Sequence, residues 1–145
     1  MGAAGRDVPA SSPPSWRPLP DTVGALRALA GRYGPAVVSN GDDDPFDASA
    51  RRPGVPFAAV VTSEQTRCHK PPPPVFEEVL RRLGAAPGSV AHVAEGVTEV
   101  PPARRLGRAT VRVRRHGCSA GLLAEAPDAE VPDSRSLLAR MGVNG

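Results

Sequence analysis

Residues 35–41 read PAVVSNG, a short apolar run that ends in three turn-forming residues. A bounded, valine-rich run of this length predicts a buried strand that leads into a turn. Three further runs have the same character: FAAVV at 57–61, VAHVA at 90–94 and ATVRV at 109–113. Strands without regular polar alternation are typical of a parallel sheet that is covered on both faces. These four runs therefore predict the sheet of an α/β protein.

Helical patterns lie before, between and after the predicted strands. Asp21 is predicted to cap a first helix, and Asp133 a last one. Pro74 suits the first turn of a middle helix, for which Gly84 is the predicted C-cap. Strands alternating with helices predict a doubly wound, Rossmann-like core with helices on both faces of a parallel sheet. In such sheets the functional site lies beyond the carboxyl ends of the strands.

Length and composition limit the class of protein. The chain has 145 residues, which suits one domain, and contains 18 Pro and 15 Gly. Residues 1–20 are rich in Pro, Ser and Gly and predict a tail or linker, which leaves 21–142 as the folded core. No apolar run is long enough to span a bilayer and no secretory signal is visible, so we expect a cytoplasmic protein. Cys68 and Cys118 are too few for a disulfide framework or a four-thiolate metal site.

The positive charge of the chain comes almost entirely from arginine. The formal net charge is +3, and Lys70 is the only lysine. A run of basic residues from Arg104 to Arg115 could contact phosphate backbones, with His116 directly after it. However, no aromatic platform lies nearby on which bases could stack. We interpret the run as a solvated surface of an arginine-rich chain, and we regard nucleic acid as an unlikely partner.

Three groups of polar residues are candidates for a functional site, and two of them follow predicted strands. Ser39 and Asn40 follow the first predicted strand and could bind an oxyanion, although both are also common in ordinary turns. Lys70 stands before a run of prolines and could present a point charge to a carboxylate or phosphate, or could be a solvated surface lysine. Glu95 and Glu99 follow the third predicted strand and could position water or bind a hard cation, or could be solvated loop acids.

Other candidate motifs carry less information. His92 lies within a predicted strand, where a satisfied core or rim histidine is a better interpretation than a catalytic base. His116 and Cys118 are too few to bind zinc. The sequence has no Walker loop, no dinucleotide glycine fingerprint and no Gly-x-Ser-x-Gly elbow.

The order of the three groups resembles motifs two, three and four of the haloacid dehalogenase superfamily of hydrolases. Ser39-Asn40 after a strand, Lys70-Pro71, and Glu95 with Glu99 after a later strand match that order. The connecting text is also similar to the 2-haloacid dehalogenase branch, so that the resemblance covers roughly residues 16–142. The similar segments are 16–22, 37–40, 57–65, 69–71, 76–80, 92–94, 102–107 and 127–137.

The resemblance implies a hydrolase that uses an aspartate nucleophile at the end of the first strand and forms an ester that water then hydrolyses. On this pattern Ser39 and Asn40 bind the anionic group of a small substrate or the leaving anion. Lys70 keeps the aspartate ionised and balances negative charge. Glu95 and Glu99 occupy the loop that binds magnesium in phosphatase members and positions water in dehalogenase members. For a dehalogenase-like chain the resemblance therefore implies a small 2-halo acid as substrate and no metal or other cofactor.

The sequence also departs from the family pattern. No aspartate follows a hydrophobic strand near the N-terminus, and the helical cap that normally comes next has no room. Asp7 echoes the nucleophile motif but does not follow a predicted strand, and the usual acids of motif four are glutamates here. We expect a truncated core that lacks the first strand and the cap. Its turnover is in doubt, its unpaired sheet edges make it marginally stable, and a homodimer is one assembly to test. The alternative function is a non-catalytic remnant that binds anions or serves as an interaction domain. A phosphatase and a nucleic-acid-binding module are less favoured alternatives.

Overall fold

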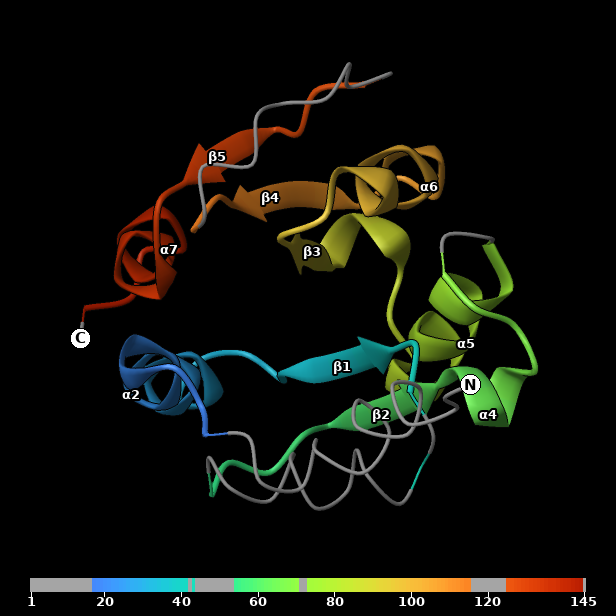
Figure 1. The fold of residues 1–145 in the computed structure, drawn as a ribbon, viewed down its shortest axis with the longest axis horizontal. Helices are drawn as coiled ribbons and strands as arrows, with labels where there is room; N and C mark the ends of the chain where they lie inside the picture. Colours follow the sequence, from blue (N-terminus) through green and yellow to red (C-terminus); the bar gives the residue numbers. More distant parts are fainter. Residues whose placement is uncertain (1–16, 42, 44–53, 71–72, 116–124, 145) are drawn as a thin grey trace, which may run out of the picture.

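The structure is a computed structural model that describes residues 17–41, 43, 54–70, 73–115 and 125–144. Figure 1 shows the order of its helices and strands along the chain. They are α2 (Pro20–Ala30), β1 (Ala36–Ser39), β2 (Ala59–Thr62), α4 (Ser63–Thr66), α5 (Pro73–Leu83), η2 (Pro87–Ser89), β3 (Ala91–Ala94), η3 (Val97–Glu99), α6 (Val100–Arg105), β4 (Ala109–Val113), β5 (Ala129–Val131) and α7 (Ser134–Arg140).

All the strand pairs in the described residues are parallel. β1 pairs with β2, with Ala36 opposite Ala59, and β3, β4 and β5 pair in that order, with Ala91 opposite Ala109. The predicted α/β class with parallel strands is therefore confirmed. Within the described residues the strands form two separate groups, because β1 pairs with β2 alone and β3 with β4 alone.

Helices cover the strands from two sides. α5 contacts β1 and β2, α6 contacts β3 and β4, and α2 packs against α7. Figure 1 shows α2 and α7 together on the left of the molecule and α4, α5 and α6 on the right. This arrangement confirms the predicted Rossmann-like core with helices on both faces.

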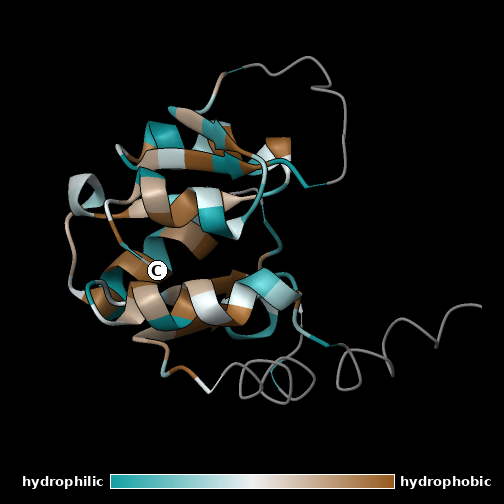
Figure 2. Ribbon diagram, turned by 90° about the vertical axis from the view of Figure 1, so that its left-hand side faces the viewer, coloured by the Kyte–Doolittle hydropathy of each residue, from teal (hydrophilic) through white to brown (hydrophobic). Residues whose placement is uncertain are grey.

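The hydrophobic core has two centres that correspond to the two groups of strands. The first joins Val61 of β2 to Val75 and Val79 of α5, and Val61 and Val75 are completely buried. The second joins the valines of β4 and β5 to Leu137 of α7. Figure 2 shows hydrophobic stretches on the strands and on the helices that pack against them. Burial of these branched side chains is the main favourable contribution to the fold.

The helix ends agree with the sequence predictions except at the first helix. Gly84 ends α5 with a φ of +59°, and the Asp133 side chain accepts a hydrogen bond from the Ser136 amide at the start of α7. The prediction that Asp21 caps the first helix is wrong. α2 begins at Pro20, because proline has the φ of a first helical residue and its missing N–H has no partner there, so Asp21 lies inside the first turn.

Some predictions concern residues that the structure does not describe, and one strand was not predicted. Asp7, His116, Cys118 and most of the predicted tail lie outside the described residues. The short strand β5 was missed because a three-residue segment gives almost no periodic signal.

The prediction of a solvated arginine surface is wrong for three members of the run. Arg108 and Arg112 are 4% and 1% exposed, and the Arg115 side chain is 17% exposed. The Arg108 guanidinium donates to the Phe76 carbonyl, and Arg112 Nε donates to the Glu95 carbonyl at 3.2 Å. Their long stems let each charged group cross from one element to the next, so these arginines link elements. Within the described residues no helix is both long enough and apolar enough to cross a bilayer.

Candidate functional site

A cavity of about 620 Å³ lies between β1 and β3 and is also lined by residues of α2 and α7. Of the predicted site residues, Lys70, Glu95 and Glu99 line this cavity. Glu95 and Glu99 follow the carboxyl end of β3, and Lys70 is linked to the residue that follows β1. The cavity therefore opens where a parallel α/β sheet is expected to carry its site.

Asn40 holds the backbone of Lys70 with both ends of its side-chain amide. Its Oδ1 accepts from the Lys70 N–H at 2.6 Å, and its Nδ2 donates to the Lys70 carbonyl at 3.4 Å. The pair fixes the segment before the prolines to the end of β1, where Ser39 is the last, half-buried strand residue. In this structure the Asn40 amide positions the lysine.

The Lys70 ammonium belongs to a three-residue network around the Glu99 carboxylate. Nζ lies 2.8 Å from Glu99 Oε1, and His92 Nε2 lies 2.9 Å from Glu99 Oε2. The side chains of Lys70 and Glu99 are 15% and 18% exposed, so the pair is largely shielded from water. The His92 ring is buried and packs edge-on against Phe76, with 5.2 Å between ring centroids. The prediction that His92 is a satisfied core or rim histidine agrees with this position.

The partners of Glu99 determine its charge. Burial raises the pKa of this carboxyl, but the hydrogen bonds from His92 and Lys70 and the charge of Lys70 lower it more. The pKa therefore lies below its ordinary value, and Glu99 is ionised at neutral pH. Lys70 and Glu99 together form an ion pair that lines the cavity.

The site does not fit a magnesium ion. Mg²⁺ in phosphatase-like sites needs carboxylate oxygens that are free to coordinate it. Both Glu99 oxygens already accept hydrogen bonds, one from an ammonium group and one from a histidine ring. In the described part of the chain no three metal-ligating side chains cluster together.

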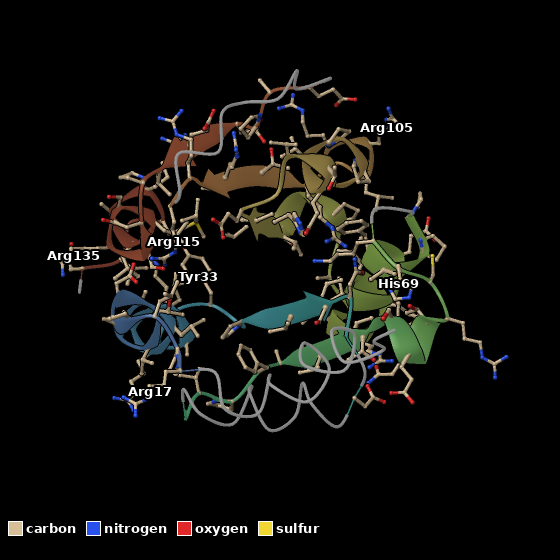
Figure 3. All side chains as sticks on the ribbon, in the orientation of Figure 1. Arg17, Tyr33, His69, Arg105, Arg115 and Arg135 are labelled. Carbon is tan, nitrogen blue, oxygen red and sulfur yellow. The ribbon has the colours of Figure 1, made fainter. Side chains whose placement is uncertain are left out.

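Arg115 is a cavity residue that sequence reasoning missed. Its Nη1 donates to Asp21 Oδ1 at 2.8 Å, and the Ser134 amide donates to Asp21 Oδ2 at 2.8 Å. Arg115, Thr22 and Ser134 line the cavity, and Figure 3 labels Arg115 between α2 and α7. The hydrogen bond from Arg115 is the main cause that lowers the pKa of Asp21 to about 2. The signal in the sequence was the position of Arg115 just past the carboxyl end of a predicted strand.

The structure thus brings together most of the predicted site. Asn40, Lys70 and Glu99 form one connected network, and Glu95 lines the same cavity. The carboxylates among the described lining residues are Glu95 and Glu99, and no aspartate is among them. Lys70 is held at the end of β1, beside the acidic loop that follows β3. The fold is therefore a Rossmann-like core with a charged site at the ends of its strands.

Comparison with known proteins identifies the family of this core. The family model of haloacid dehalogenase-like hydrolases matches residues 11–107. The chain belongs to this family.

Curated relatives include two dehalogenases. Haloacetate dehalogenase H-2 of Moraxella sp. (strain B) is 29% identical over 119 residues, which are 80% of this chain and 53% of the relative. (S)-2-haloacid dehalogenase 1 of Pseudomonas sp. (strain CBS-3) is 29% identical over 99 residues, which are 66% of this chain and 44% of the relative. The chain therefore spans about half the length of these relatives.

Solved structures include both dehalogenases and a phosphatase. The L-2-haloacid dehalogenase of Xanthobacter autotrophicus, solved with chloropropionic acid covalently bound, matches with a TM-score of 0.76 and 28% identity. That match covers 89% of this chain and 63% of the dehalogenase. A haloacid dehalogenase-type phosphatase from Thermococcus onnurineus matches with a TM-score of 0.78 and 25% identity, over 90% of this chain and 61% of the phosphatase.

Proposed function

We propose that the chain carries the core of a hydrolase that removes halide from a small 2-halo acid. The observation that carries the proposal is the network of Lys70, Asn40 and Glu99 at the carboxyl ends of β1 and β3. Relatives named as haloacid and haloacetate dehalogenases support the substrate class. The substrate is a small anion, so a positive group that is held in place in the lining of a cavity suits it.

In the proposed reaction an aspartate carboxylate attacks the carbon that bears the halogen. A C–O bond forms, the C–halogen bond breaks and halide leaves. Water then attacks the ester carbonyl, which releases a 2-hydroxy acid and restores the carboxylate. Lys70 would share its charge between Glu99 and the incoming anion, and Asn40 would hold Lys70 in place. No aspartate is among the described residues that line the cavity. The nucleophilic aspartate of the proposed reaction is therefore a residue outside that set.

Chloride release from 2-chloropropionate tests this proposal. Wild-type chain should release chloride, and Lys70→Met should lower the rate at least about a hundredfold, the usual cost of losing one preorganised electrostatic group. Arg140→Met, which removes a positive charge from an exposed position in the last turn of α7, should leave the rate unchanged. No chloride release by the wild-type chain would refute the enzymatic proposal for the chain as it stands.

A non-catalytic anion-binding domain is the second candidate. Two observations favour it. The carboxylates among the described lining residues are glutamates and not an aspartate, and Lys70 is already paired with Glu99. Lactate, the 2-hydroxy acid that corresponds to 2-chloropropionate, should then raise the melting temperature without any chloride release. The increase should disappear in Lys70→Met and persist in Arg140→Met. No stabilisation of the wild-type chain by lactate or by 2-chloropropionate would exclude this candidate.

A further inference from the structure

The cavity between β1 and β3 is bounded by two strand edges. In the described part of the chain β1 pairs with β2 alone and β3 with β4 alone, so each strand has one edge without a strand partner. Both strands line the same cavity, and both have four residues. An unpaired edge presents a row of N–H and C=O groups that another strand can bind. The cavity is therefore lined by two strands that each have an edge without a strand partner in the described chain.

Side chains around the cavity are more exposed than those of a parallel sheet that is covered on both faces. All four residues of β1 are only half-buried, and Val93 of β3 is 41% exposed. The partner strands β2 and β4 are mostly buried. Inner strands of a parallel sheet are normally covered on both faces. On α2, Leu26 and Leu29 line the cavity and are also only half-buried. The apolar surface around the cavity is therefore incompletely covered.

The segments that follow the two strands are connected through Lys70. Asn40, just past the end of β1, binds the backbone of Lys70, and the Lys70 ammonium binds Glu99, past the end of β3. At the other end, Pro35 and Val90, which precede β1 and β3, line the same cavity. Within each of the two groups, all strand pairs of the described chain are parallel.

We propose that this cavity binds one extended apolar segment of a separate polypeptide as an additional strand between β1 and β3. Such strand addition takes its affinity from main-chain hydrogen bonds and its specificity from alternate side chains. The segment would have about four or five residues with apolar side chains on both faces and no proline, which cannot donate to a strand edge. Solved relatives contain more chain than this one spans, since it covers 58% and 63% of two of them.

A second copy of the chain is a poorer occupant. A strand that enters between β1 and β3 must have both of its own edges free. Every strand of the described chain already has at least one edge paired, so a second copy could insert one only by breaking its own sheet. The proposal makes no use of the hydrolytic chemistry, so peptide binding is measured without substrate and halide release without peptide.

Peptide titration of the full chain tests the proposal. The peptide has the apolar run Ala-Val-Val-Ala-Val, which extends the sequence of residues 36–38, between pairs of lysines, and carries a fluorescein label. Fluorescence anisotropy should show saturable binding below about 1 mM. Hydrogen exchange should slow at the amides of β1 and β3. A peptide with proline at the central position should bind at least about tenfold more weakly, because it lacks the central N–H.

A pair of chain variants locates the binding site. Val93→Lys places a charge inside the cavity and should weaken binding at least about tenfold. Leu19→Lys is the matched control, since Leu19 is 45% exposed and does not line the cavity, and it should bind like the wild type. Far-UV circular dichroism checks that both variants fold. The proposal is overturned if the peptide does not bind, if the proline peptide binds equally well, or if protection appears on β2 or β5 instead. A chain that dimerises and no longer binds peptide would also overturn it, by assigning the cavity to a second copy.

Discussion

Substitution of Asp21 by Asn tests how far one carboxylate joins separate elements of the fold. The Asp21 carboxylate accepts from Arg115, which follows β4, and from the Ser134 amide at the start of α7, each at 2.8 Å. Asn has nearly the same shape but no charge, so Asp21→Asn removes the ion pair while it leaves one oxygen acceptor. The substitution therefore weakens a contact among α2, α7 and the end of β4.

The pKa of Asp21 gives the magnitude. It falls from 3.8 to about 2, mainly because of the hydrogen bond from Arg115. At 1.36 kcal/mol per pKa unit this corresponds to at most about 2 kcal/mol of folding free energy. The Asp21 side chain is 19% exposed, and solvent screening reduces the expected loss at pH 7 to about 1–2 kcal/mol. Because the folded pKa is depressed, the stabilisation is complete above pH 4 and is lost as pH falls through about 2.

Urea unfolding of the wild type and Asp21→Asn at several pH values measures this difference. The two free energies of unfolding should differ by about 1–2 kcal/mol from pH 7 to pH 5 and converge between pH 4 and pH 2. Glu77→Gln is the control, because it removes the same charge from an exposed position on α5 and should change stability by less than about 0.5 kcal/mol. A difference that does not depend on pH, or one no larger than that of the control, would refute the reasoning.

Two further predictions follow from burial and from backbone conformation, and both can be measured by urea unfolding. Val61→Ala should lower the free energy of unfolding by about 2 kcal/mol because Val61 is completely buried. Val93→Ala should lower it by less than about 1 kcal/mol because Val93 is 41% exposed. Equal losses would contradict the incomplete cover of β3. Gly84→Ala should cost about 1–2 kcal/mol through its φ of +59° alone, since a Cβ there meets no atom within 4 Å. Gly88→Ala also meets open space without a positive φ and should be close to neutral, so an equal loss at both glycines would refute the conformational explanation.

Local features of the sequence predicted the elements that form around strong patterns. The valine-rich runs became β1 to β4, and Asp133 and Gly84 limit α7 and α5 as predicted. These predictions succeed because apolar periodicity, capping and positive φ depend on neighbouring residues. β5 was not predicted because three residues are too few for a periodic pattern. Asp21 was wrongly predicted as the N-cap of the first helix because the preceding proline starts that helix one residue earlier.

The candidate site was predicted from the order of its residues along the chain and through resemblance to a family. Asn40 and Glu99 were predicted to follow strands and Lys70 to precede a run of prolines, and the structure joins the three in one network. No sequence pattern showed that the Asn40 amide would hold the Lys70 backbone, because this contact joins residues that are distant along the chain. Arg115 was assigned to a solvated run for the same reason, since its partner Asp21 is 94 residues away.

By itself, the sequence determined the α/β class, the parallel strands and the residues at their carboxyl ends, because each follows from local pattern and chain order. Only the tertiary structure decided which charges are buried and which strand edges remain without a partner. A guanidinium is buried or solvated according to the carbonyls and carboxylates that the fold brings within its reach. Likewise, the cavity between β1 and β3 exists because packing separates two groups of strands. The sequence had predicted that sheet edges would be unpaired, but which charges are buried and which edges these are depend on residues that are distant along the chain.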